Sequence, residues 1–207
     1  MGLDSIVYAI CTIISFFMSV YIFKIYKLSS EKSHLYLYYG FLILTVGLFM
    51  LSAATIFNFF SMYINGFACN NSLIDMAFSS EDMAYSLYYV ASIIAYIIFA
   101  FSYTPSKHSQ HTILPMFFLL PFWYTGFKAF HVISLFVIFY IILRSMTNFI
   151  VEKNSGSLLV STSFSLIGLY HFFFLLIDFS NIFYVLAHLS LLFGFLALLA
   201  TLVQISR

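Results

Sequence analysis

Two adjacent apolar stretches near the end of the chain constrain its fold most strongly. They run from Leu158 to Ile177 and from Ile182 to Ile205. Each is close to the length, ~20 residues, with which an α-helix crosses a hydrocarbon core of ~30 Å. Asp178, Ser180 and Asn181 lie between the two stretches, so we predict a tight turn and two antiparallel, neighbouring membrane helices.

The composition of the whole chain agrees with this environment. Of its 207 residues, 63% are hydrophobic and only 7% are charged, whereas a soluble domain has about 25% charged residues. We therefore predict a multi-pass protein of the cell membrane in contact with the lipid bilayer. The net charge of +1 gives no reason to expect a nucleic-acid partner.

Seven apolar segments can be distinguished along the chain. We predict one all-α membrane domain over residues 1–207, with helices at about 6–26, 35–60, 83–103, 111–127, 129–149, 158–177 and 182–205. The fourth segment is short and contains Pro115 and Pro121. The longest link, from Ser61 to Asp82, is polar and contains no Lys or Arg, so we predict a loop there.

The charged residues separate into two groups on this layout. Seven of the eight basic residues fall on one side of the membrane: Lys24, Lys27, Lys32, Lys107, Arg144, Lys153 and Arg207. The other side collects the acidic residues Asp4, Asp75, Glu81, Asp82 and Asp178, with Lys128. Because basic loops stay in the cytoplasm, we predict the N-terminus outside and the C-terminus inside.

Aromatic residues cluster near the predicted membrane boundaries. The outer group consists of Tyr63, Tyr85, Tyr88, Trp123 and Tyr124. Two interpretations fit this group: a belt of interfacial side chains, or an aromatic pocket that opens outward.

The first three and last three segments share several features that suggest a duplication. Each half has a basic loop after its first helix, a Gly-Leu-aromatic sequence in its second helix (at Gly47 and Gly168) and a Tyr-Val pair early in its third (at Tyr89 and Tyr184). Two parallel three-helix repeats with a linker helix resemble the layout of SWEET and PQ-loop transporters, which would imply a small-solute transporter. The Pro-Gln pair of those transporters is missing, however, and the first and fifth segments contain no proline. The layout also matches microbial rhodopsins, but the last segment has no lysine for retinal.

A second resemblance covers most of the chain. The first helix ends in basic residues, the middle helices contain small residues, and the last helix reads Tyr-Val-Leu-Ala-His and then Leu-Leu-Phe-Gly-Phe. In this style the chain resembles small seven-helix archaeal membrane proteins of uncharacterised function and the membrane sensor modules of prokaryotic signalling proteins. That resemblance implies a sensing role and assigns no site residues.

The histidines of the last two segments are the sharpest chemical feature, because ionisable groups inside a bilayer are costly. His171 lies on a helix face with Ser161 and Ser165, whereas His188 lies opposite the small residues of its own helix. Three interpretations remain open: structural hydrogen bonding, ligand or proton sensing, and haem ligation by the two histidines. We predict that His171 faces the bundle, with a partner on the fifth or seventh helix, and that His131 is interfacial.

Asn58 and Tyr184 complete the candidate ligand-binding or polar-core residues, and no metal site is predicted. Catalytic motifs such as H-E-x-x-H or G-x-S-x-G are missing from the chain, so we do not expect an enzyme. The sequence favours a membrane sensor or a subunit of a larger membrane complex. The alternatives are the small-solute transporter and a haem-binding electron-transfer protein. Because Arg207 ends the sequence at the membrane edge, we expect a sensor to signal through a protein partner in the membrane.

Overall fold

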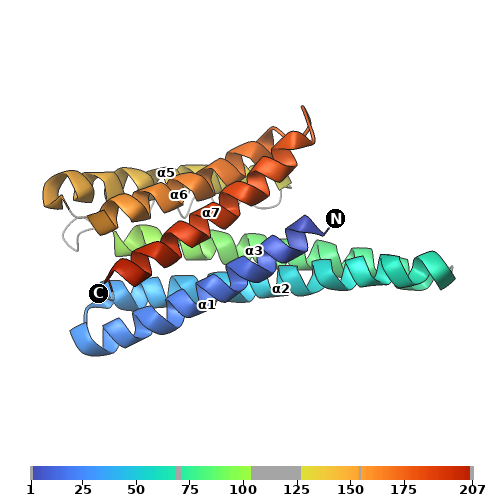
Figure 1. The fold of residues 1–207 in the computed structure, drawn as a ribbon, viewed down its shortest axis with the longest axis horizontal. Coiled ribbons are helices and arrows are strands. Elements are labelled where there is room, and N and C mark those ends of the chain that lie inside the picture. Colours follow the sequence, from blue (N-terminus) through green and yellow to red (C-terminus); the bar gives the residue numbers. More distant parts are fainter. Residues whose placement is uncertain (1, 69–70, 104–126, 154, 206–207) are drawn as a thin grey trace.

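The computed structural model describes residues 2–68, 71–103, 127–153 and 155–205, which form six helices (Figure 1). These are α1 (Leu3–Ser29), α2 (Lys32–Ala68), α3 (Asn71–Ser102), α5 (Phe127–Glu152), α6 (Ser155–Leu175) and α7 (Ile182–Ile205). All six are long and apolar enough to cross a membrane, which confirms an all-α, multi-pass architecture. The described residues contain six such helices and not seven, and the helix predicted at 111–127 lies outside them.

The helices pack as two three-helix halves. In the first half α2 lies between α1 and α3, and in the second half α6 lies between α5 and α7. The halves meet at two seams, where α1 packs against α7 and α3 packs against α5. The order of packing is therefore the same in both halves.

At each seam the two helices begin at the same end of the bundle. The ring of Tyr89 in α3 stacks on that of Phe130, near the start of α5, with 4.1 Å between the ring centroids. Tyr8, near the start of α1, contacts His188, near the start of α7. Both seams are therefore parallel, whereas consecutive helices within each half run antiparallel.

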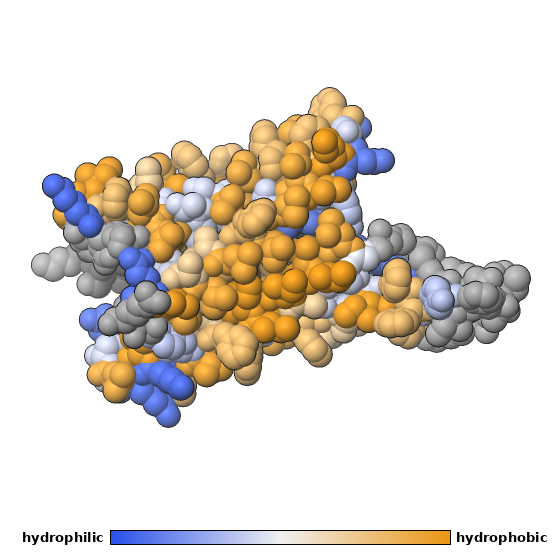
Figure 2. Space-filling model, viewed as in Figure 1, coloured by the Kyte–Doolittle hydropathy of each residue, from blue (hydrophilic) through white to orange (hydrophobic). Residues whose placement is uncertain are grey.

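The two ends of the bundle differ in charge, as the sequence predicted. We call one the acidic end, where the structure places Asp4, Glu81, Asp82, Lys128 and Asp178. The basic end carries Lys24, Lys27, Lys32, Arg144 and Lys153. Figure 2 shows hydrophobic side chains across the middle of the visible face and hydrophilic ones toward its two ends. Which end faces outward remains a prediction.

The link predicted as a loop from Ser61 to Asp82 is helical over most of its length, so that prediction was wrong. The first helix of this pair, α2, continues to Ala68, and α3 begins at Asn71. With 37 residues, α2 is about 55 Å long at 1.5 Å per residue, which exceeds the hydrocarbon thickness. Figure 1 shows the two helices projecting beyond the start of α1. The hydropathy pattern locates the end of the apolar stretch, and the helix itself continues past it.

Short turns with defined caps join the helices at both ends. At the basic end, Ser30 is left-handed (φ 56°) and its N–H donates to the carbonyl of Tyr26 at 2.8 Å. Lys153 closes α5 in the same way, donating to the carbonyl of Phe149 at 2.8 Å. The turn between α6 and α7 contains Asp178, which confirms the predicted antiparallel pair.

The glycines that suggested a duplication do not occupy equivalent positions. A Cβ on Gly47 would lie 2.7 Å from the Cβ of Ala91, so this glycine faces α3, the third helix of its half. A Cβ on Gly168 would lie 3.4 Å from Ile138, so this one faces α5, the first helix of its half. The packing order supports two related halves, but this glycine correspondence does not.

Candidate functional site

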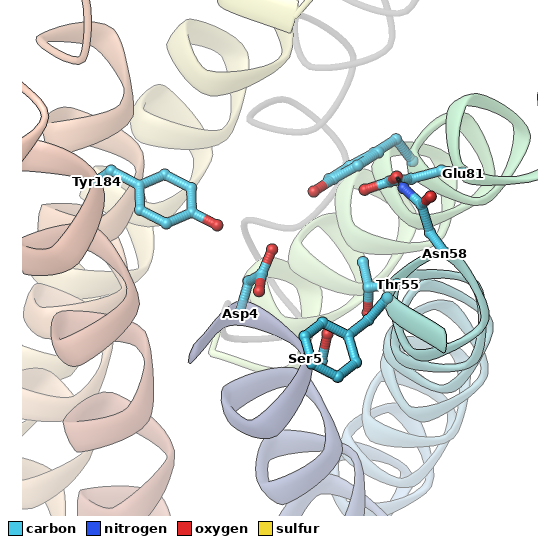
Figure 3. Close-up of a pocket in the computed structure, with 8 residues that line it drawn as sticks. Asp4, Ser5, Thr55, Asn58, Glu81 and Tyr184 are labelled. Carbon is cyan, nitrogen blue, oxygen red and sulfur yellow. Dashed lines mark hydrogen bonds between the residues drawn. The ribbon is translucent and has the colours of Figure 1, made fainter. Parts of the chain in front are cut away.

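A polar pocket of about 290 Å³ lies at the acidic end of the bundle (Figure 3). Its lining comes from α1, α2, α3 and α7, so both halves contribute to it. The lining residues are Asp4, Ser5, Thr55, Asn58, Phe59, Glu81, Tyr85 and Tyr184. The pocket therefore joins two carboxylates with three aromatic rings.

The first turn of α1 brings Asp4 to the pocket. Gly2 precedes the helix with φ 148°, a backbone conformation that favours glycine, and its N–H donates to Oδ1 of Asp4 at 2.9 Å. The carboxylate is 7% exposed, and Figure 3 shows it directed toward the space between α1 and α7. A carboxylate accepts several hydrogen bonds, so the contact with Gly2 leaves acceptor capacity on Asp4.

Asn58 and Glu81 form a polar pair across α2 and α3. The amide Nδ2 of Asn58 donates to Oε2 of Glu81. Because an ionised carboxylate only accepts, this contact fixes the orientation of the amide and directs Oδ1 away from Glu81. Asn58 is only 4% exposed, and its Oδ1 has no hydrogen-bond partner among the described residues.

An unpaired buried carbonyl oxygen of this kind is unusual. Leaving a buried acceptor without a donor costs about 1–3 kcal/mol, so such atoms call for a partner such as water or a ligand. Asn58 is one of the residues that line the pocket.

Tyr184 forms the wall that faces α1 from the second half. Figure 3 shows its hydroxyl pointing across the pocket toward Asp4. Tyr85 and Phe59 contribute the aromatic sides from α3 and α2. The outward-opening aromatic pocket was one of the two predicted interpretations, and Tyr85 supports it. Tyr88, in contrast, is buried in the core and does not belong to an interfacial belt.

Below the pocket, His188 connects Tyr184 in the pocket wall with α1 through hydrogen bonds. The imidazole Nδ1 lies 2.8 Å from the carbonyl oxygen of Tyr184, so Nδ1 carries the proton and donates. The hydroxyl of Tyr8 lies 3.2 Å from Nε2 and donates to it. Tyr8 and Cys11 are buried about one and two turns further along α1 than Asp4.

A second imidazole cluster crosses the seam between α3 and the second half. Nδ1 of His171 lies 2.9 Å from Nδ1 of His131 in α5, and its Nε2 lies 3.2 Å from the hydroxyl of Tyr96 in α3. His171 is fully buried, which confirms the predicted orientation and a partner on the fifth helix. His131 is 1% exposed, so the prediction that it is interfacial was wrong. The buried residues Ser134, Ile138 and Ile141 share its helix face, which places that face inside the bundle.

The geometry around His171 and His188 does not fit haem ligation. Both ring nitrogens of each residue already lie at hydrogen-bond distance from a partner within the protein. The ring of Tyr170 packs against both imidazoles, with centroid distances of 4.8 Å to His171 and 6.4 Å to His188. An aromatic side chain therefore occupies the place that a flat cofactor between the two would need. The described residues also contain no cluster of three side chains suited to a metal ion.

The serines on the helix face of His171 donate to backbone carbonyls of their own helix or take part in the contact between α5 and α6. Ser165 donates to the carbonyl of Ser161 at 2.8 Å, one turn earlier in the same helix. Ser145 of α5 donates to the carbonyl of Ser157 at 2.9 Å, which holds this face of α6 against α5. Ser161 and Ser165 therefore do not reach the pocket.

Two of the six predicted site residues, Asn58 and Tyr184, meet in the pocket. Asp4 and Glu81 were not predicted as site residues, because the sequence indicated them only as charges on the outer side. A signal was available, since each carboxylate lies at the edge of an apolar segment on the same predicted side of the membrane.

Comparison of the chain with protein-family models, curated proteins and solved structures finds no match.

Proposed function

We propose that this chain is a membrane sensor without catalytic activity, which binds a small ligand in the pocket at its acidic end. One observation carries this proposal: the pocket is built across the seam between the two halves, with Asp4 on one side and Tyr184 on the other. The binding free energy of a ligand that contacts both residues depends on the distance between α1 and α7. Such a difference in binding free energy is what shifts a conformational equilibrium.

The contacts below the pocket supply a path for that shift. His188 accepts from Tyr8 of α1 and donates to the backbone of Tyr184, so movement of the pocket wall changes the packing at the α1–α7 seam. A protein partner in the membrane would respond to this change in packing through contacts with the helix surfaces or with the basic end. The resemblance to membrane sensor modules of prokaryotic signalling proteins supports this role.

The predicted orientation places the pocket on the outer side, where it would meet ligands from outside the cell. The seven-helix, N-out topology predicted from the sequence forms part of the proposal.

A small-solute transporter is the second candidate, and the identical packing order of the two halves favours it. A transporter needs a route to the other side, however. Below the pocket, Tyr8, Tyr88 and Cys11 are buried in the core. A separate apolar cavity of about 180 Å³ near the basic end shares no lining residue with the pocket. In this conformation the described residues favour binding over passage.

Cys11 offers a direct test of sensing. It is fully buried one turn below Tyr8, and Cys69 can be replaced by serine so that Cys11 is the only thiol. The experiment measures its reaction rate with a small thiol reagent in proteoliposomes while a panel of amines, amino acids, carboxylates and sugars is added. A sensor changes this rate when its ligand binds and does not accumulate the ligand inside. Accumulation would assign the transporter, and a rate that no compound class alters would contradict both functions.

A further inference from the structure

We propose that the pocket at the acidic end selects a small organic cation with an ammonium group. This inference rests on the proposed function, because it names the ligand class for the same pocket. The lining contains the carboxylates of Asp4 and Glu81, and Asn58 beside them has a buried amide oxygen without a hydrogen-bond partner among the described residues. Each of these groups accepts hydrogen bonds, and none of the described residues that line the pocket is Lys or Arg.

The polar groups of the lining favour a ligand that donates hydrogen bonds and carries a positive charge. One N–H of Asn58 Nδ2 donates to Glu81, and Oδ1 of Asn58 is buried without a hydrogen-bond partner among the described residues. The Asp4 carboxylate is almost completely buried and has one backbone donor, Gly2. An ammonium group supplies up to three N–H donors, and its single positive charge offsets one of the two negative charges of the lining.

The aromatic lining distinguishes an organic cation from a metal ion. Phe59, Tyr85 and Tyr184 surround the same space as the carboxylates, and aromatic faces attract ammonium groups by cation–π interaction. A hard metal cation instead takes six to eight oxygen ligands or bound waters, for which three aromatic rings are poor neighbours. The volume of about 290 Å³ suits a small ligand, since pockets for drug-sized molecules range over ~300–1,000 Å³.

The test compares four probes of similar shape on the purified full chain in nanodiscs: butylamine, 1,4-diaminobutane, butanol and butyrate. Calorimetry should detect binding of one or both amines and none of butanol or butyrate. Calcium chloride serves as the metal probe. Binding of butanol as tightly as butylamine, binding of calcium without any amine, or no amine binding at millimolar concentration would each overturn the assignment.

Variants test whether the amine occupies this pocket. Asp4→Asn and Glu81→Gln each remove one negative charge and keep the shape, so each should weaken amine binding roughly tenfold or more. Asp178→Asn is the matched control, because Asp178 is an exposed carboxylate at the same end that pairs with Lys128 outside the pocket. Circular dichroism and size-exclusion chromatography verify that each variant folds. If Asp4→Asn and Glu81→Gln both bind the amine like the parent protein, the site lies elsewhere and the inference fails.

The experiments distinguish a failure of the ammonium assignment from a failure of the sensor proposal. If an amine binds in the pocket and the reactivity of Cys11 does not change, the ligand class stands and sensing is contradicted. If only a compound of another class changes the reactivity of Cys11, the sensor proposal stands and the ammonium assignment is overturned.

Discussion

The buried imidazoles are polar groups in an apolar interior, and both ring nitrogens of His171 and of His188 lie at hydrogen-bond distance from a partner. His171 contacts both His131 and Tyr96, so one side chain joins α6 to α5 and α3. His188 similarly joins α7 to α1 through Tyr8. Because an unpaired polar group in an apolar interior is expensive, these contacts fix how the two halves meet.

Replacing His171 by alanine should destabilise the folded protein by about 1–3 kcal/mol, because Tyr96 and His131 then lose a buried partner. Thermal unfolding in nanodiscs measures the effect. Leu169→Ala on the exposed face of the same helix is the control and should change much less. Equal unfolding temperatures for His171→Ala and the parent protein would show that the imidazole contacts are dispensable.

Replacing Tyr8 by phenylalanine removes only the hydroxyl that donates to Nε2 of His188. We expect a loss of stability of about 1 kcal/mol, since a buried acceptor is left without its donor. Tyr36→Phe is the matched control, because Tyr36 is exposed on α2. A Tyr8→Phe protein as stable as the Tyr36→Phe protein would remove His188 from the link between the halves.

At the scale of the helices, small residues decide how closely neighbours pack. A Cβ on Gly194 would lie 2.8 Å from Cγ1 of Ile167 and 3.1 Å from the carbonyl oxygen of Ser163 in α6. The backbone atom cannot move without shifting the helix. A Cβ on Gly168 would meet Ile138 at 3.4 Å, which is an ordinary contact.

This contrast predicts opposite results for two equivalent substitutions. Gly194→Ala should lower the unfolding temperature because α6 and α7 must separate. Gly168→Ala should be neutral or stabilising, since alanine favours a helix over glycine by about 1 kcal/mol. Thermal unfolding of both variants under the same conditions is the measurement. A Gly194→Ala protein that is as stable as Gly168→Ala would contradict the close packing of α6 and α7.

The apolar pattern predicted the existence and order of the described helices, because membrane crossing requires about 20 apolar residues. The α6–α7 pair was predicted within a few residues at each boundary: Ser155–Leu175 was expected at 158–177 and Ile182–Ile205 at 182–205. The pattern failed at the link between α2 and α3, where polar residues remain helical beyond the apolar stretch. Hydropathy indicates which part of a helix lies in an apolar environment. It does not indicate the residue at which the helix ends.

The site was less predictable than the helices for a different reason. Asn58 and Tyr184 were candidates as single polar residues, but they are 126 positions apart and meet only because α1 packs against α7 beside α2. The sequence pattern shows which face of a helix is polar and does not show which helix it meets. The same limit explains why His171 was expected near His188 in one interpretation and instead contacts His131.

For the whole molecule, the charge asymmetry predicts one orientation in the membrane. With both native cysteines replaced, a membrane-impermeant thiol reagent added to intact cells should modify Phe179→Cys at the acidic end. It should not modify Lys27→Cys at the basic end, because the basic loops stay inside. Both positions are exposed on the bundle, so accessibility differs only through the membrane. Labelling of Lys27→Cys from outside would reverse the topology.

The pocket between the halves is tested most directly by its charge. Phe59→Cys places a thiol on the lining near the two carboxylates, and Phe179→Cys places one at the same end outside the pocket. The measurement compares the rates of a trimethylammonium-bearing and a sulfonate-bearing methanethiosulfonate reagent at each position. An acidic pocket should favour the cationic reagent roughly tenfold more at position 59 than at 179, because a charged cleft concentrates opposite charge. Replacing Asp4 and Glu81 by their amides should abolish this preference. Equal preferences at the two positions, or a preference that survives the amide substitutions, would contradict an acidic binding pocket at this end of the protein.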